Sequence, residues 1–224
     1  MMDYLDDNQR EAIGYSFLMN EMQIHTPYGL EIKNNVNPYN KEDSDLLIKE
    51  LDDLDKIIGI IKKQSNIIHG IEFCLRKYKD IRNIVMQIQN EKILDEVELF
   101  EIKNFSLTTE ELIDLYKKID FQVDKIYLRS PKPLLNFLDP KNQRISTFHI
   151  CQSYSKELEY IREKKRRIEE NFAKEEDEQV KELLKNERNS VVIEEKEEEL
   201  RVRKELTEKL RENIFILEDN VISV

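Results

Sequence analysis

The residues that could do chemistry in this chain are few and scattered. The three histidines, His25, His69 and His149, have no metal-ligand spacing with one another or with the two cysteines, Cys74 and Cys151. We therefore expect each histidine to be a structural or surface residue, and we assign no metal site. The cysteines form no spaced framework, so both are expected to be free thiols, with Cys74 in the core.

The glycines also lack the spacing that nucleotide chemistry requires. Gly14, Gly29, Gly59 and Gly70 stand alone, and the chain has no G-x-x-x-x-G-K-[ST] loop to cradle a phosphate. A serine nucleophile elbow is missing too. Carboxylates are abundant, but their pattern places them on solvated helix faces, where catalytic pairing is rare. We assign no catalytic residue, no cofactor-binding residue and no cofactor, and we expect that the chain is not an enzyme.

One basic cluster, residues 162–167 with the sequence REKKRR, has the composition of a phosphate-binding patch. The alternative is that these cations pair with glutamates of a neighbouring helix. We favour it because Glu205, Glu208 and Glu212 are the predicted neighbours of residues 164–167. The net charge of -11 also argues against a general nucleic-acid-binding surface, since phosphate binding depends on an excess of Lys and Arg.

The basic cluster lies in the stretch that organises the chain, residues 153–187. This stretch contains no Pro and no Gly and is dense in strong helix formers. Ser155 is a suitable N-cap. The apolar residues form one narrow stripe at helical spacing: Leu158, Ile161, Ile168, Phe172, Val180, Leu183 and Leu184. The stripe predicts a long helix that needs a partner for this face.

The predicted partner is the last stretch of the chain, residues 194–221. Its stripe consists of Leu200, Leu206, Leu210, Ile214, Leu217 and Val221. The turn-like cluster between the two stretches is residues 186–190, and folding back near Asn189 brings Ile168 level with Leu210. We therefore predict an antiparallel two-helix arm over residues 153–224. The alternative is two independent, solvated helices, which are marginal without tertiary packing.

Residues 1–152 are expected to form a multi-helix core domain. The pattern predicts helices over residues 10–22, 43–63, 66–78, 80–90, 93–105 and 108–119, with a stop at 25–29. The second of these should bury a face that carries Leu47, Leu51, Leu54, Ile57, Ile58 and Ile61. Near residues 125–151 we expect a small β-hairpin or clip with strands over 125–128 and 144–150. The predicted fold class is mainly α.

Targeting and membrane signals are missing from the sequence. The first ten residues are acidic and polar, which excludes a signal peptide there. Apolar runs stay well short of the ~20 residues that span a bilayer. We expect a cytoplasmic protein that does not bind membranes.

Several segments resemble the core and lever regions of the MutS-type DNA mismatch-repair ATPases. The opening, REAIGYSFLMNEMQIHTPYGLEIK, is similar to the start of that core, with a Thr-x-x-Gly-like turn at residues 26–29. Residues 45–61, DLLIKELDDLDKIIGII, fit its next element. The start of the lever resembles residues 153–170, in which Ser155, Glu157, Leu158, Ile161 and Arg162 match the pattern. The returning lever is similar to residues 194–213.

The resemblance implies a fold and a partner. In the family, core and levers connect a DNA-gripping region to an ABC-type ATPase that dimerises. This chain departs from the family because it lacks the mismatch-reading domain with its Phe-x-Glu motif, leaves no room for a clamp at the turn near Asn189, and ends before any ATPase domain. ATP would therefore act on an ATPase domain in cis or in trans. A homodimer is possible, and the acidic tip predicts at most weak contact with duplex DNA.

Two functions follow as hypotheses. The first is a non-catalytic core and lever module that relays nucleotide-dependent movement between subunits or to DNA. The alternative is a stand-alone acidic helical adaptor that binds partner proteins through its coiled-coil-like arm.

Overall fold

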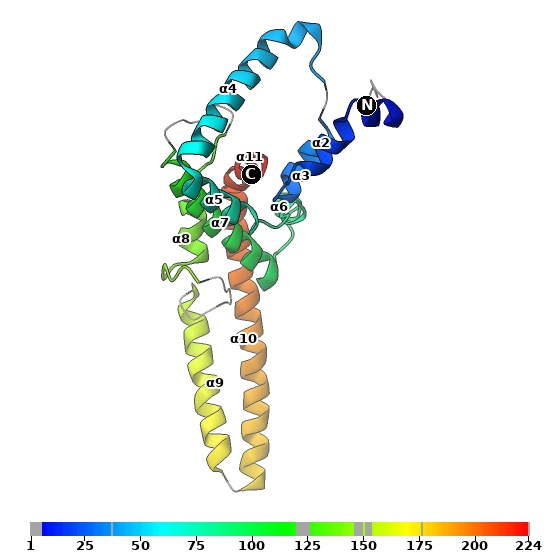
Figure 1. Cartoon of the computed structure of the whole chain (residues 1–224). Helices are drawn as coiled ribbons and strands as arrows, with labels where there is room; N and C mark the ends of the chain where they lie inside the picture. Colours follow the sequence, from blue (N-terminus) through cyan, green and yellow to red (C-terminus); the bar gives the residue numbers. More distant parts are fainter. Residues whose placement is uncertain are drawn as a thin grey trace. The chain divides into compact units, whose positions relative to one another are not determined.

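The computed structural model describes residues 6–36, 38–119, 126–145, 150, 154–175 and 177–223. Its regular elements are helices, which confirms the mainly α class (Figure 1). The chain divides into two compact units. Unit 1 comprises residues 1–80, 111–128 and 221–224, and unit 2 comprises residues 81–110 and 129–220. The boundary predicted near residue 152 lies inside unit 2, which includes residues 129–220.

Unit 1 contains the first five α-helices. These are α1 (Asp7–Ala12), α2 (Tyr15–Glu21), α3 (Pro27–Asn34), α4 (Ser44–Lys63) and α5 (Ser65–Leu75), with a 3-10 turn at Lys41–Asp43 before α4. The single helix predicted over 10–22 is wrong, because Gly14 adopts a φ of 75° and separates α1 from α2. The preceding helix does end before residues 25–29, at Glu21, but this segment is not only a stop. Thr26 also starts α3, with its side chain accepting a bond from the amide of Gly29.

The buried core of unit 1 is small. Among its described residues, the buried apolar ones are Tyr28, Cys74, Tyr78 and Leu112. The Tyr28 hydroxyl donates to the carbonyl of Lys79 at 3.0 Å. The bounds of α4 match the prediction, but the prediction that its apolar face is buried is wrong. Leu51 and Leu54 are 55% and 52% exposed. Helical periodicity identifies the face that can be buried, whereas burial also requires a partner in the fold.

Unit 2 holds α6 (Arg82–Gln89), α8 (Lys132–Leu138), α9 (Lys156–Lys174) and α10 (Glu178–Glu212), together with most of α7 (Glu96–Tyr116) and α11 (Ile214–Ser223). Its core is extensive, with many fully buried side chains: Ile81, Ile88, Leu94, Leu99, Ile102, Leu134, Leu138, Leu158, Leu210, Ile216 and Leu217. The two helices predicted over 93–119 are one helix, α7. The hydroxyl of Thr109 donates to the carbonyl of Phe105 inside it.

The predicted β-hairpin is not supported. The described part of residues 125–151 contains no strand, and the segment between the two expected strands forms α8. Residues 125, 146–149 and 151 of this prediction lie outside the described residues. Pro131 and Pro133 suit this helix, because proline is tolerated in the first turn, where its missing N–H would have no helical partner.

Helices α9 and α10 run antiparallel and side by side in unit 2, and we call this pair the helical hairpin (Figure 1). The predicted turn near Asn189 is wrong, since Asn189 lies inside α10. The chain turns instead between Lys174, the last residue of α9, and Glu178, the first residue of α10. The side chain of Asp177 caps α10 there by accepting from the amides of Gln179 and Val180, at 2.8 and 3.2 Å.

Candidate functional site at the base of the helical hairpin

The start of α9 is fixed to α8 and α10 by two side chains. The hydroxyl of Tyr154 donates to the carbonyl of Leu138, the last residue of α8, at 2.8 Å. Ser155 caps α9, as the sequence predicts, by accepting from the amide of Leu158. The same Ser155 hydroxyl donates to the carboxylate of Glu198 on α10. The N-terminal end of α9 is therefore held by both neighbouring helices.

One arginine joins the two helices of the hairpin to the body of unit 2. Arg162 donates to Glu195 at 2.9 Å, to Glu199 at 2.6 Å and to the carbonyl of Ile150 at 2.8 Å. Lys165 donates to the second oxygen of Glu195 at 2.7 Å. The amide of Ile150 in turn donates to Glu96 in the first turn of α7. A chain of charged hydrogen bonds thus runs from α10 through α9 to α7.

These contacts shift the pKa values of Glu195 and Arg162. Burial disfavours the ionised form of Glu195, but the bonds from Lys165 and Arg162 outweigh burial and hold its pKa below the usual value. The bonds from Glu195 and Glu199 likewise outweigh burial of Arg162 and raise its pKa. Glu195 and Arg162 therefore stay charged and paired across the neutral pH range.

The basic cluster is engaged in ion pairs within the chain, as we favoured over phosphate binding. On the exposed side of α9, Glu163 accepts from both Arg166 and Arg167, and these bonds lower its pKa to about 2. Lys164 lies 3.6 Å from Glu194 on α10. The partner of Lys164 lies in the stretch that the sequence predicts to pack against α9, residues 194–221. The predicted partners around Glu205 to Glu212 are wrong, because the earlier turn shifts the register of α10.

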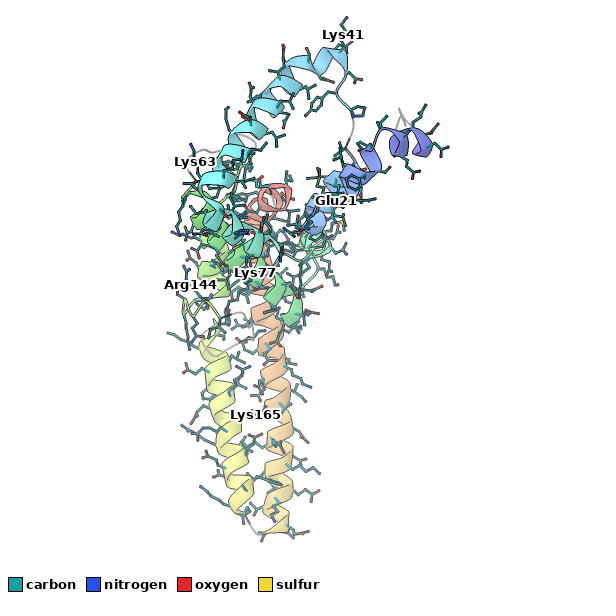
Figure 2. The ribbon with its side chains drawn as sticks, in the orientation of Figure 1. Glu21, Lys41, Lys63, Lys77, Arg144 and Lys165 are labelled. Carbon is teal, nitrogen blue, oxygen red and sulfur yellow. The ribbon has the colours of Figure 1, made fainter. Side chains whose placement is uncertain are left out.

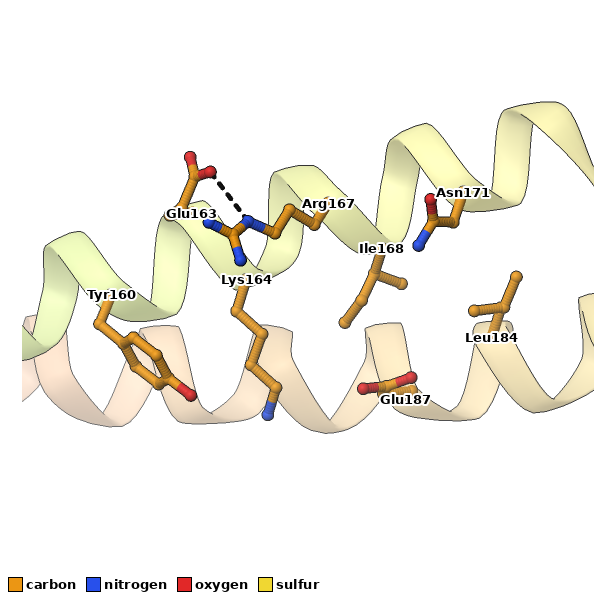
Figure 3. Close-up of a pocket in the computed structure, with 8 residues that line it drawn as sticks. All are labelled: Tyr160, Glu163, Lys164, Arg167, Ile168, Asn171, Leu184 and Glu187. Carbon is orange, nitrogen blue, oxygen red and sulfur yellow. Dashed lines mark hydrogen bonds and ion pairs between the residues drawn. The ribbon is translucent and has the colours of Figure 1, made fainter.

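Further along the hairpin, apolar and charged side chains line one cavity of about 290 Å³ between α9 and α10. Figure 3 shows Ile168 and Leu184 in the space between the helices, with Glu187 beside Ile168 and the Glu163–Arg167 pair on the outer side of α9. Ile161, Ile168 and Val191 form the buried cluster that closes the hairpin, with Leu184 packed against it. Ile168 therefore packs near Leu184 and Val191 rather than Leu210.

A second polar cluster lies in unit 2 between α7 and α8. Lys103 and Asp139 form an ion pair at 3.4 Å, and their side chains are only 7% and 8% exposed. Arg144, labelled in Figure 2, pairs with Glu110 at 2.9 Å, and its backbone amide donates to Asp139 at 2.7 Å. Arg144 has a φ of 53°, a left-handed conformation that is costly for a residue with a side chain. That conformation is the one in which its amide reaches Asp139.

This cluster borders a cavity of about 300 Å³ that is also lined by Lys132, Asn136 and Asn142. Burial disfavours ionised Asp139, yet the bond from the Arg144 amide and the positive charge of Lys103 lower its pKa overall. Each carboxylate here has a cation beside it. The arrangement fits a structural joint between α7, α8 and the loop after α8.

Of the candidate chemical residues of the sequence, the structure describes His25, His69 and Cys74. His69 is exposed and lies 3.2 Å from Glu72, and Cys74 is fully buried, as predicted. Burial and the nearby Glu111 raise the pKa of Cys74 to about 11, so its thiol is unreactive. His149 and Cys151 lie outside the described residues. The described residues include no group of three His, Cys, Asp or Glu placed to hold a metal ion. They also include no helix with the length and apolar character to cross a bilayer.

The sequence matches none of the protein-family models, and no curated protein matches it. The similarity to MutS-type proteins therefore rests on the quoted residues alone.

The sequence does not identify most of the residues that join the start of α9 to α10 and α7. Arg162 belongs to the basic cluster, but its partners Glu195 and Glu199 depend on the register of the hairpin. Lys103 and Asp139 carry no local signal, because their pairing joins residues 36 positions apart.

The inner and outer glutamates of α10 should differ in their effect on stability. We expect Glu195→Gln to lower the free energy of unfolding of unit 2 by about 1–2 kcal/mol, because Arg162 and Lys165 lose a shared carboxylate that is only 13% exposed. The neighbouring Glu194→Gln, at a 44% exposed side chain, should cost less than ~0.5 kcal/mol. Urea unfolding followed by circular dichroism measures both. An equal loss of unfolding free energy in the two variants would contradict the role of Glu195 in joining α9 to α10.

Proposed function

We propose that this chain is a non-catalytic core and lever module of a MutS-like ATPase, which relays nucleotide-dependent movement between subunits or to DNA. The observation that carries the proposal is the continuity of α10. It extends over 35 residues, about 50 Å at 1.5 Å per residue, from the hairpin turn into the body of unit 2. A small rotation at one end of such a helix becomes a larger displacement at the other.

Two features of α10 support transmission along its length. In the hairpin, Val191 is fully buried against α9, and in the body, Leu210 is fully buried. Near Leu210, the hydroxyl of Thr207 accepts from the amide of Leu94, and Arg211 donates to the carbonyl of Ile88. A movement of the segment that precedes α7 therefore acts directly on α10.

The partners follow from this role. The ATPase domain would be supplied in cis or in trans, and ATP would act there. The turn of the hairpin carries Glu175, Asp177 and Glu178, so a phosphate backbone would meet net repulsion, and we propose at most weak contact with duplex DNA by this chain. A cytoplasmic location without membrane binding remains part of the proposal.

The adaptor function is a second candidate because apolar side chains of α4 are exposed. The apolar residues that close the hairpin, in contrast, face one another: Ile161, Ile168 and Val191 are buried between α9 and α10. An adaptor would therefore use α4 rather than the hairpin as its main binding surface.

A binding experiment separates the two functions. The purified chain is titrated with an isolated MutS-type ATPase domain, with and without a non-hydrolysable ATP analogue, and followed by sedimentation velocity. We expect a complex in the micromolar range, roughly -8 kcal/mol, whose affinity changes with the nucleotide. An unrelated P-loop ATPase serves as the control. Equal binding to both ATPases, or to neither, would contradict the lever function.

A further inference from the structure

Helix α4 presents an exposed apolar face with the spacing of a coiled-coil seam. Its members follow one another at steps of four, three, four and three, and we call them the α4 seam: Leu47, Leu51, Leu54, Ile58 and Ile61. Each is between 37% and 55% exposed. Alternating steps of three and four place all five on one line along the helix, as a and d positions of two heptads. A seam of this kind is suited to a second helix with the same spacing.

The charges beside the seam change sign along the helix. From Ser44 to Asp55 there are five carboxylates and one lysine, a net charge of -4, whereas from Lys56 to Lys63 there are three lysines and no carboxylate, a net charge of +3. Asp53 and Lys56 pair within the helix at 3.2 Å, so part of this charge is neutralised internally. Asp45 near one end, and Lys62 and Lys63 at the other, keep the asymmetry. Figure 2 labels Lys41, just before α4, and Lys63, its last residue.

We propose that the α4 seam is the contact surface for a second copy of this chain, with the two α4 helices antiparallel. Antiparallel packing sets the acidic half of each helix against the basic end of the other. Parallel packing would set acid against acid and base against base. An antiparallel pair of identical helices also has two-fold symmetry, which closes the assembly as a dimer, and it opposes the two helix dipoles.

The length of α4 sets the strength of the association. Twenty residues span about 30 Å, and two such helices bury less than the ~1,200 Å² at the lower limit of stable interfaces. The dimer should therefore be reversible, with a dissociation constant roughly in the micromolar range. The lever function does not depend on this dimer.

Sedimentation equilibrium of the full chain tests the dimer directly. Between roughly 1 and 300 µM we expect the average mass to rise from that of one chain towards that of two. A mass that stays at one chain over the whole range would overturn the proposal, as would growth beyond two chains, because a two-fold contact closes.

Matched variants on α4 then locate the contact. Leu51→Glu should weaken the dimer at least tenfold, because it places a carboxylate in the seam at a position that is 55% exposed. Leu46→Glu is the control, since Leu46 is 57% exposed on the same helix but lies off the seam. It should change the dissociation constant less than threefold. Circular dichroism confirms that both variants keep their helices, and equal weakening by the two would overturn the assignment of the seam.

A charge reversal tests the orientation. Lys62→Glu with Lys63→Glu should weaken the dimer several-fold, because in the antiparallel pair these positions face the acidic half of the partner helix. In a parallel pair the same change replaces base-on-base by acid-on-acid repulsion and leaves the affinity nearly unchanged. An unchanged affinity would therefore overturn the antiparallel arrangement.

Discussion

Replacing Leu210 by alanine should lower the free energy of unfolding of unit 2 by about 2–5 kcal/mol. Leu210 is fully buried where α10 enters the body of unit 2, and its truncation removes apolar contacts and leaves a cavity. Urea unfolding of the purified variant, followed by circular dichroism, measures the change. The loss should affect the body of unit 2 rather than the hairpin alone, because Leu210 lies near Thr207 and Arg211, which bond to the chain between α6 and α7 and to the end of α6.

The matched control is Leu183→Ala on the same helix. Leu183 is 69% exposed, so the same truncation should cost no more than ~0.5 kcal/mol. If the two variants unfold at the same urea concentration, α10 is not anchored in the body through Leu210.

Replacing Asp139 by asparagine should destabilise unit 2 by about 3–5 kcal/mol at neutral pH. The carboxylate is 8% exposed, and it lies beside Lys103 and accepts from the amide of Arg144. Removing one partner of a buried ion pair leaves the other charge with less compensation, which is the costly case. The double variant Lys103→Met, Asp139→Leu removes both charges together and should recover a large part of the loss. Equal instability of the single and double variants would contradict the importance of the pair.

The lowered pKa of Asp139 predicts how the stability of unit 2 depends on pH. The pKa of Asp139 is lower in the folded state than its usual value, so the folded protein binds its proton less readily than the unfolded chain. The stabilisation is therefore fully present above the unfolded pKa, about 3.9, and is lost as the pH falls through the folded pKa. Denaturation measured from pH 7 downwards should show a smaller acid-dependent loss for Asp139→Asn than for the unaltered chain. An equal acid-dependent loss of stability in the variant and the unaltered chain would contradict its assignment to Asp139.

The sequence predicts single helices well where local signals agree. The helix over 43–63, the Ser155 cap and the helices α5 and α6 appear close to their predicted bounds, because apolar period and helix formers coincide there. The break at Gly14 was missed because an isolated glycine can also lie within a helix, and only its φ of 75° distinguishes the two cases.

The turn of the hairpin shows why long charged helices are hard to align. Residues 186–190 have only weakly unfavourable helix propensity and are absorbed into α10. The local signal at the true turn was Asp177, an N-cap followed by Glu178 in the first helical turn. Stripes that repeat every three or four residues match at several registers, so the pattern alone does not select one.

The contacts of the candidate site could not be predicted, because they join distant segments. Arg162 meets Ile150 and Glu199 only when the register is known, and Lys103 meets Asp139 only after α7 and α8 have packed. The exposed face of α4 was missed for a related reason, since its apolar period is the same whether a neighbour covers it or not.

Hydrogen exchange of the chain bound to a MutS-type ATPase domain tests the lever function most directly. The exchange of α9 and α10 is compared by mass spectrometry in the presence of ADP and of a non-hydrolysable ATP analogue. The lever function predicts that the nucleotide changes protection at the base, around Arg162 and Glu195, and along α10 as far as Val191. A complex in which protection of α9 and α10 is the same with both nucleotides would contradict it.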